Sequence, residues 1–260
     1  MRETTLPGLT TRAFGRIALC PKRVDSTNRM LKERGGTLPH GTVCYTDRQE
    51  AGRGRLGRTW VAAPGDTLAL SLLIKPAEPS PALPLICGLA VSHALESLCG
   101  GAAFGVKWPN DIVCAGRKVC GILCETVWIG EGWTVAGIGI NRRQDARAFE
   151  RAGLARAGSL RMLTGCEPGE REIAASVLNE LEALWDRLRR DGFAPLRPAY
   201  EARCVTIGQE VRVLTPEGAV RLEGRADGVG DDGRLRVLAP DGPHLVDAGE
   251  VSVRGARGYV

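Results

Sequence analysis

The sequence has few histidines and no cysteine pair with the spacing of a structural metal site. Its 260 residues include three histidines and nine cysteines, and no two cysteines are separated by two residues. Structural zinc sites need clustered Cys and His ligands, so this pattern argues against one. None of the three histidines lies in a catalytic-triad context. Cys120 and Cys124, in one apolar run, are interpreted as small hydrophobic residues.

The chain also lacks a secretion signal and a long apolar run. It begins Met-Arg-Glu-Thr-Thr-Leu-Pro-Gly, without the apolar segment of a signal peptide. No stretch is long enough to span a bilayer. Free cysteines without such a signal are typical of the reducing cytoplasm. We therefore expect a cytoplasmic protein that does not associate with membranes.

Three common catalytic signatures are missing as well. The chain contains no GxxxxGK[ST] phosphate loop, no GxSxG elbow and no GxGxxG turn opening a dinucleotide-binding helix. Of its residues, 43% are hydrophobic, which suffices for one sizeable core in one or two domains. The net charge of +5 permits anionic substrates but is low for a nucleic-acid-binding protein.

Periodicity predicts an α+β protein with a change of character near residue 203. Up to that point, three helices and five strands are expected. The helices are predicted at 25–34, 85–99 and 171–191, and the strands at 42–45, 66–75, 106–114, 118–128 and 133–141.

Beyond residue 203, short alternating runs separated by Gly- and Asp-rich turns predict a small antiparallel barrel. These runs lie at 210–214, 219–226, 234–238 and 250–253. Two domains are therefore expected, at residues 1–203 and 204–260.

A loop rich in glycine and arginine is the most informative segment of the chain. Residues 52–60 read Gly-Arg-Gly-Arg-Leu-Gly-Arg-Thr-Trp and follow closely on Gln49. Glycines let a backbone approach a ligand, and arginines bind carboxylates and phosphates. The segment either closes over a small anion that carries a flat ring, or it is a solvated tail that contacts nucleic acid.

Two further segments carry residues suited to an anion site. Residues 107–111 read Lys-Trp-Pro-Asn-Asp, where Asn110 and Asp111 either form a turn or take part in function. Lys118 opens the apolar run 118–125 beside Gly121, and is either a solvated hairpin lysine or an anion ligand. Glu125 is either a buried pairing partner or a turn residue.

Alternating glycines mark a candidate pocket floor in the segment 137–141, Gly-Ile-Gly-Ile-Asn. Residues two apart on a strand share a face, so Gly137 and Gly139 clear one face of side chains. The same pattern also fits a bulge or close sheet packing.

Taken together, these segments resemble the biotin protein ligases. The resemblance rests on five motifs in the family's order, at 25–28 (Asp-Ser-Thr-Asn), 49–55, 107–111, 118–123 and 137–141. It is strong over about residues 20–145 and weaker beyond. It implies a mixed-sheet catalytic domain of the biotin/lipoate ligase type and a small C-terminal SH3-like β-barrel. Residues 1–24 are too few for the winged-helix domain of bifunctional members, so we expect the short form and no DNA binding.

The resemblance implies ATP-dependent attachment of biotin to a lysine of a biotin carboxyl carrier protein, through biotinyl-5′-AMP. The carrier would be a subunit of acetyl-CoA carboxylase or a similar enzyme. The implied cofactors are ATP and Mg²⁺, with the metal held mainly by the phosphates and Asp111 as the candidate protein ligand. We expect a monomer or a homodimer.

Carried over by position, the resemblance also implies the site residues. Lys118, Arg53 and Arg55 are the expected catalytic residues. The expected biotin-binding residues are Ser26, Thr27, Asn28, Gln49, Arg53, Gly54, Arg55, Lys118, Gly121, Ile122, Gly137 and Gly139. The expected ATP- or adenylate-binding residues are Arg53, Arg55, Trp60, Asn110, Lys118 and Asn141. Arg58 is expected to be a surface or flanking charge, and the arginine loop a lid that becomes ordered on binding.

Two alternatives stay open at this point. A lipoate or octanoate protein ligase shares the fold and chemistry, but such enzymes show an arginine pair leading to a triple glycine, which this chain lacks. A non-catalytic RNA-binding module is the second alternative. The modest charge and the few aromatic residues, which are not interleaved with basic ones, argue against it.

Overall fold

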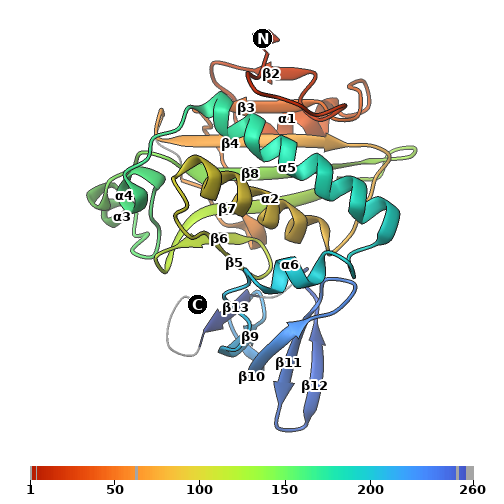
Figure 1. Ribbon diagram of the computed structural model, residues 1–260, viewed down its shortest axis with the longest axis vertical. Coiled ribbons are helices and arrows are strands. Elements are labelled where there is room, and N and C mark those ends of the chain that lie inside the picture. Colours follow the sequence, from red (N-terminus) through yellow and green to blue (C-terminus); the bar gives the residue numbers. More distant parts are fainter. Residues whose placement is uncertain (1, 4, 62–63, 250–251, 256–260) are drawn as a thin grey trace.

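The computed structural model describes residues 2–3, 5–61, 64–249 and 252–255, which form a large mixed sheet flanked by helices and a smaller C-terminal sheet (Figure 1). The large sheet has the strand order β1-β2-β3-β4-β8-β7-β6-β5. Its strands are β1 (Arg2–Glu3), β2 (Ala18–Cys20), β3 (Val43–Thr46), β4 (Thr67–Ile74), β5 (Gly105–Lys107), β6 (Asp111–Cys114), β7 (Arg117–Val127) and β8 (Trp133–Asn141).

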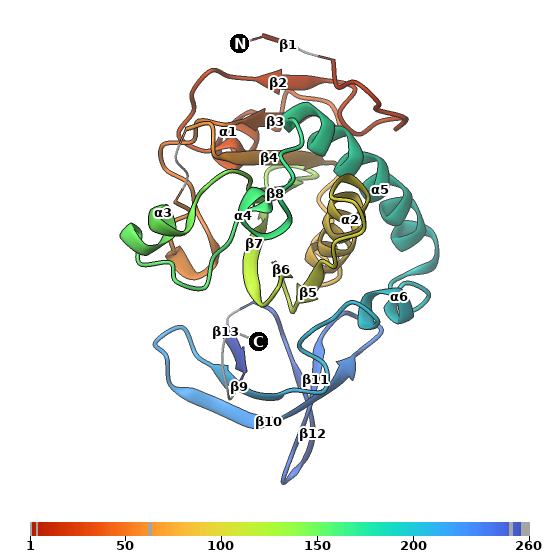
Figure 2. The same ribbon diagram turned by 60° about the vertical axis from the view of Figure 1, so that its left-hand side comes forward.

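Helices cover both faces of this sheet. Figure 2 shows α1 on one side and the pair α2 and α5 on the other. The helices are α1 (Thr27–Arg34), α2 (Leu83–Leu98), α3 (Ala146–Arg151), α4 (Leu160–Thr164), α5 (Glu170–Asp191) and α6 (Arg197–Glu201), with a 3₁₀ turn, η1 (Arg55–Gly57). None of the helices in the described residues is both long and apolar enough to cross a membrane.

The main core lies between the sheet and the α2–α5 layer. The predicted apolar stripe of α5 is buried there, with Ile173, Leu178 and Trp185 all inaccessible or nearly so. A second, smaller cluster lies under α1, where Leu31 packs on Leu73 and Val135. Burial on both faces explains the near-continuous apolar sequence of the central strand β4.

The predicted strands at 42–45, 66–75, 118–128 and 133–141 are confirmed to within two residues, but the single strand at 106–114 is wrong. It is two strands, β5 and β6, joined by a turn at residues 108–110. Pro109 has no N–H for a ladder hydrogen bond, so the chain turns at this point and pairs back on itself.

The sheet register aligns residues of neighbouring strands in rows on the α1 face, and the glycines lie in the first two rows. Ala69 of β4, Gly139 of β8, Gly121 of β7 and Asp111 of β6 stand opposite one another across four strands. A second row joins Ser71, Gly137 and Leu123, and a third joins Leu73, Val135 and Glu125. Because residues two apart share a face, all three rows lie on the same side.

The C-terminal sheet has the antiparallel order β12-β11-β10-β9-β13. Its strands are β9 (Glu210–Leu214), β10 (Val220–Val229), β11 (Leu235–Ala239), β12 (Gly242–Val246) and β13 (Ser252–Gly255). No strand was predicted at β12, which contains Pro243; a proline is tolerated there because β12 is an edge strand. The five short strands match the expected barrel domain, and within the described residues no ladder joins β12 to β13.

Candidate active site

A cavity of about 230 Å³ opens over the glycine rows on the α1 face, bounded by the arginine loop and by β13. Every residue expected at the site lies in its wall. These are Ser26, Thr27, Asn28, Gln49, Arg53, Gly54, Arg55, Trp60, Asn110, Asp111, Lys118, Gly121, Ile122, Gly137, Gly139 and Asn141. The five motifs, far apart in sequence, therefore converge on one cavity.

The floor of the cavity is bare sheet, as the alternating glycines predicted. The indole of Trp60 lies directly on it, since a Cβ atom added to Gly139 would be 2.7 Å from Trp60 Cε2. A Cβ atom at Gly121 would be 3.1 Å from both Trp60 Cζ3 and Lys118 Nζ. Any side chain at these two positions would therefore displace the indole. Ile122 differs, because its Cδ1 atom lies on the opposite face, 3.8 Å from a Cβ atom built at Gly88 of α2.

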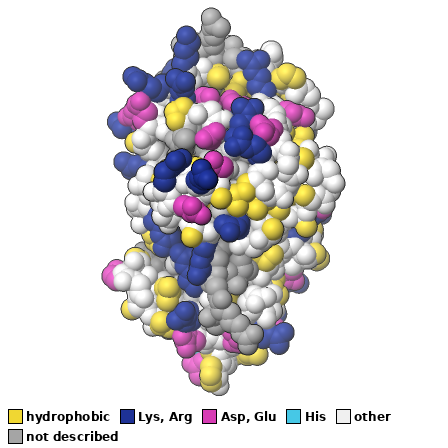
Figure 3. All heavy atoms as spheres, turned by 90° about the vertical axis from the view of Figure 1, so that its left-hand side faces the viewer, with side chains coloured by type: hydrophobic (Ala, Val, Ile, Leu, Met, Phe, Trp, Pro, Cys, Tyr) yellow, Lys and Arg dark blue, Asp and Glu magenta, His cyan; other side chains and the backbone are white. Residues whose placement is uncertain are grey.

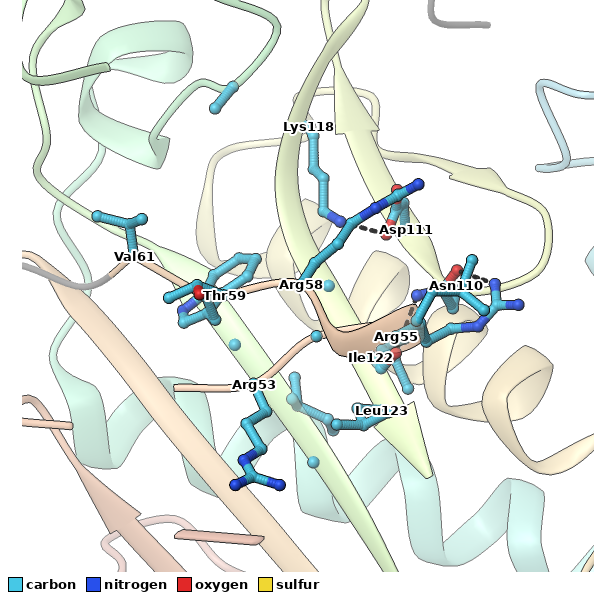
Figure 4. Close-up of a pocket in the computed structure, with 18 of the residues that line it drawn as sticks. Arg53, Arg55, Arg58, Thr59, Val61, Asn110, Asp111, Lys118, Ile122 and Leu123 are labelled. Carbon is cyan, nitrogen blue, oxygen red and sulfur yellow. Dashed lines mark hydrogen bonds and ion pairs between the residues drawn. The ribbon is translucent and has the colours of Figure 1, made fainter. Parts of the chain in front are cut away.

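Lys118 and Asp111 form an ion pair at one end of the floor, with Lys118 Nζ 2.5 Å from Asp111 Oδ1 (Figure 4). Both side chains are largely buried, which strengthens their attraction relative to a surface pair. The backbone of Lys118 is held as well, because its N–H donates to Arg156 O and its carbonyl accepts from Gly158. The lysine is thus a fixed positive charge beside the glycine floor.

The opposite end of the cavity is a network of neutral polar groups at the start of α1. Ser26 caps this helix, and its hydroxyl accepts from the N–H of Arg29. Gln49 Oε1 accepts from the Thr27 N–H at 2.9 Å, and Ser71 Oγ lies 2.6 Å from Asn28 Oδ1. These buried groups are positioned before any ligand arrives.

The arginine loop is a short hairpin. Gly54 N–H donates to Arg58 O at 2.7 Å, and Trp60 N–H donates to Gly52 O at 2.9 Å. Gly52 is required by this closure, because a Cβ atom there would lie 2.5 Å from Trp60 O. The turn is completed by Leu56, which adopts a positive φ of 55°.

The three loop arginines point to different places. Arg55 donates to Asn110 Oδ1 at 2.9 Å and also to Ala248 O of the C-terminal domain. Figure 4 shows Arg53 directed away from Lys118, whereas Arg58 extends toward Asp111. Arg58, expected to be a surface or flanking charge, is exposed and also lines the cavity.

Both asparagines assigned to the nucleotide are tied into the fold. Asn110 Nδ2 donates to Ile122 O at 2.9 Å, and its backbone carbonyl accepts from the Ile122 N–H. Asn141 Nδ2 donates to Gly158 O at 3.1 Å, and its Oδ1 accepts from Gln144. Asn141 therefore holds residue 158 of the segment after α3, of which Leu154 and Ala157 line the cavity.

Lys107 is a wall residue that was not assigned to the site from the sequence. It is only 5% exposed, and its Nζ donates to Val253 O of β13 at 2.9 Å. Burial lowers the pKa of Lys107 to about 8, opposed by Asp111 and reinforced by the nearby Arg254, Lys118 and Arg55. The signal in the sequence was its place at the start of the segment 107–111; it shares the face of Asp111 because the two residues stand opposite each other in the β5–β6 pair.

The C-terminal domain completes the wall with Ser252, Val253 and Arg254 of β13. This contribution could not be inferred from the sequence, because it depends on how the two sheets pack.

Burial also lowers the pKa of Arg55, but a guanidinium remains charged at neutral pH. Lys118, Lys107, Arg55 and Arg58 outnumber Asp111, so the cavity attracts anions. On the outer face beside α3 and α4, basic side chains alternate with acidic ones (Figure 3).

Among the described residues there is no group of three or more His, Cys, Asp or Glu side chains placed to hold a metal ion. Asp111 is a single carboxylate and is paired with Lys118. Such a donor fits a Mg²⁺ ion only where most ligands come from substrate phosphates and water.

Cys120 faces the core, where burial raises the pKa of its thiol, and it acts as the predicted small hydrophobic residue.

The sequence matches two family models. Residues 20–145 match the biotin/lipoate A/B protein ligase family, and residues 206–254 match the biotin protein ligase C terminal domain. The chain is 34% identical to the biotin--[acetyl-CoA-carboxylase] ligase of Paracoccus denitrificans, over 90% of this chain and 99% of that protein. It is 35% identical to the ligase of the same name from Mycobacterium tuberculosis, over 88% of this chain and 86% of that protein.

A solved structure agrees with these matches. The biotin protein ligase from Aquifex aeolicus in complex with biotin and ATP superposes with a TM-score of 0.80 at 32% identity. The superposition covers 92% of this chain and 99% of that one. Both family models, the near full-length relatives and the shared fold lead to one conclusion: this chain belongs to the biotin protein ligase family.

Proposed function

We propose that this protein activates biotin with ATP and transfers it to a lysine of a carrier protein. The observation that carries the proposal is the shape of one cavity. It has a neutral polar end at Thr27, Asn28 and Gln49, a glycine floor, and the cation Lys118 at the far end. Biotin has the matching order of groups, with a ureido ring, an apolar valeryl chain and a carboxylate.

The glycine floor sets the direction in which biotin lies. The polar end adjoins the row with Ser71 and Gly137, and Lys118 lies over the row with Gly139 and Gly121. The ring would contact the first row and the carboxylate would point along the second toward Lys118. The indole of Trp60 now lies directly on that second row, so it would move off the floor to admit the chain and would then face the adenylate.

In the first step the biotin carboxylate attacks the α-phosphorus of ATP, the bond to the β-phosphate breaks, and pyrophosphate leaves. Two anions must approach each other, so fixed cations are needed to offset their repulsion. Lys118 would contact both the carboxylate and the α-phosphate, while Arg53 and Arg55 close over the adenylate. Positioning supplies the remaining rate gain, because no covalent nucleophile is required.

In the second step the amine of the carrier lysine attacks the acyl carbon of biotinyl-5′-AMP. The carbon–oxygen bond to the phosphate breaks, AMP leaves, and the amine loses a proton to form the amide. The Paracoccus and Mycobacterium relatives are named as ligases of acetyl-CoA carboxylase. We therefore infer that the acceptor is a biotin carboxyl carrier protein.

A Mg²⁺ ion fits this site as a companion of ATP. When bound it would neutralise phosphate charge, and Asp111 is the side chain of the cavity that could contribute one oxygen ligand. Lys107, Lys118 and Arg55 would balance the charge that remains on the phosphates.

The proposal is tested by biotin-dependent exchange of labelled pyrophosphate into ATP, with lipoate and octanoate as competing substrates. We expect exchange with biotin and no exchange with lipoate or octanoate. Exchange with lipoate or octanoate and none with biotin would replace the proposal with a lipoate-type ligase. Transfer to a purified carrier domain, detected as its mass increase, tests the second step.

A further inference from the structure

Glu125 is half-buried on the cavity face of the sheet although no step of the reaction uses it. It stands in the third row beside Val135, under α1. Its Oε1 lies 2.6 Å from Lys32 Nζ, and its Oε2 accepts from Asn28 Nδ2 at 2.9 Å. The side chains of Glu125 and Lys32 are 24% and 33% exposed. A glutamate so placed links a surface lysine to a residue of the polar end.

The partners of Asn28 determine which way its amide faces. Asn28 Nδ2 lies 2.9 Å from a carboxylate oxygen and 3.1 Å from the backbone carbonyl of Leu123. Both partners can only accept, so the NH₂ group of the amide must face them. The carbonyl oxygen of Asn28 is thereby turned toward Ser71 and toward Gly137, which has no side chain in the way.

The same logic orders the rest of the network. Asn28 Oδ1 carries no hydrogen, so the Ser71 hydroxyl must donate across the 2.6 Å that separates them. Since its one hydrogen is used there, Ser71 Oγ can only accept across the 2.7 Å to the Thr27 hydroxyl, whose proton is then not shared with Gln49 Oε1, 3.2 Å away. Hydrogen bonds therefore run in one direction from Thr27 through Ser71 and Asn28 to Glu125. The charge of Glu125, held by Lys32, sets that direction.

We propose that Lys32 and Glu125 are a positioning pair that keeps the polar end of the biotin cavity rich in acceptor oxygens. The inference rests on the proposed function and names the specificity of that same site. A ureido ring brings two N–H donors, which need acceptors in a dry pocket. A dithiolane ring has no N–H, so it would leave the second acceptor site of the turned Asn28 carbonyl, the one not taken by Ser71, without a donor.

Exchanging Glu125 for glutamine separates this role from simple packing. Glutamine has the same shape, but one of its two terminal groups is now a donor. With Lys32 present, the glutamine carbonyl turns to the ammonium and its NH₂ group meets Asn28. Asn28 must then rotate its own amide or lose a hydrogen bond. If Lys32 is also replaced by methionine, the glutamine carbonyl is free to face Asn28 again.

The experiment compares wild type, Glu125→Gln, Lys32→Met, the double variant and the control Glu96→Gln. Glu96 is likewise a half-buried glutamate, paired with Arg203 at 2.5 Å, but it lies on α2 away from the cavity. We expect Glu125→Gln to raise the KM for biotin roughly tenfold with the KM for ATP little changed, as for one lost hydrogen bond to a charged group. The selectivity for biotin over lipoate should fall with it.

Rescue is the decisive readout. The double variant should recover most of the affinity for biotin although it carries two changes, which a merely structural role does not predict. The side-chain amide resonances of Asn28, identified by their loss in Asn28→Asp, should shift in Glu125→Gln and return in the double variant. This NMR test needs no substrate, so it decides the inference even if wild type fails to use biotin.

Three results would overturn the inference. One is an unchanged KM for biotin in Glu125→Gln. Another is a double variant that is weaker than Glu125→Gln alone. The third is a fall in the melting temperature accompanied by equal rises in the KM values for biotin and ATP. Lack of biotin-dependent exchange in wild type would instead refute the proposed function.

Discussion

Lys118 Nζ and Asp111 Oδ1 lie 2.5 Å apart because strand β7 contains a bulge. Ile112 stands opposite Cys120 and Val113 stands opposite Lys118, so Val119 is the extra residue. Strict alternation would place Lys118 and Gly121 on opposite faces. The bulge lets Val119 and Cys120 both enter the core and turns Lys118 to the cavity side, beside Gly121 and Asp111.

Lys118→Ala should abolish biotin-dependent pyrophosphate exchange, with a loss of roughly a hundredfold or more, since it removes a fixed cation where charge develops. The variant should still fold, because its backbone contacts with Arg156 and Gly158 do not involve the side chain, although loss of the ion pair with Asp111 should lower its melting temperature. Lys22→Ala, at an exposed lysine outside the cavity, is the control and should exchange normally. Wild-type exchange by a folded Lys118→Ala protein would remove Lys118 from the mechanism.

Gly139→Val should lower kcat/KM for biotin roughly 10- to 100-fold, because overpacking of a closed site typically costs about 1–3 kcal/mol. The new side chain would enter the space of the Trp60 indole, 2.7 Å from the Cβ position. Gly36→Ala is the control, because a Cβ atom at Gly36 would lie 3.8 Å from its nearest neighbour, Trp133, which is an ordinary contact distance. Steady-state kinetics measures both variants. Equal kcat/KM values for biotin in the two variants would show that Gly139 is not part of the biotin floor.

Stability should increase between about pH 8 and pH 10.5 through Lys107. Its pKa in the folded protein is about 8, against 10.5 as the ordinary value. In this interval the unfolded chain binds one more proton at Lys107 than the folded chain does, so stability rises with pH. Below pH 8 the cost of burying the charge is fully present, at roughly 3 kcal/mol.

Urea unfolding of wild type and Lys107→Met at several pH values measures this effect. The free energy of unfolding of wild type, relative to the variant, should grow by up to roughly 3 kcal/mol across the interval. Lys22→Met serves as the exposed control and should track wild type at every pH. A pH-independent difference between wild type and Lys107→Met would contradict the lowered pKa.

Glu182→Ala should destabilise the protein by roughly 3 kcal/mol, since it leaves three backbone donors without their charged acceptor. Glu182 is buried on α5, and its carboxylate accepts from the N–H groups of Arg12, Ala13 and Phe14 at 2.6–2.8 Å. Glu180→Ala on the same helix, with a more exposed side chain, should cost much less. Thermal unfolding checks the difference, and the KM for biotin should be unchanged in both.

Hydrogen exchange of the arginine loop should slow when biotin and ATP are added together. Residues 52–61 carry the exposed Arg53 and Arg58, and ligand contacts would offset the entropy lost when the loop closes. The turn at residues 215–218 lies outside the cavity lining and should exchange at the same rate with and without ligands. An arginine loop with equal exchange in both states is not a lid.

Much of the fold follows from local pattern. Period 3.6 in 171–191 and period 2 in 133–141 predicted α5 and β8 because each pattern fits only one kind of buried face. The segments β2, α3, α4 and α6 were not predicted, since they are short and their sequences have no strong period. The strand at 106–114 was mispredicted because its apolar residues outweighed the signal of Pro109.

The sequence by itself determined which residues could form an anion site, because glycine, arginine and lysine carry their chemistry wherever they stand. It also determined the α1 cap and the bare face at Gly137 and Gly139, which depend on neighbours in the chain. Tertiary structure alone decided that Lys118 faces Asp111, that β13 contributes to the wall, and that Glu125 is a half-buried pairing partner. Those facts depend on a bulge, on the packing of two sheets and on the register under α1, all of which are set by residues distant in sequence.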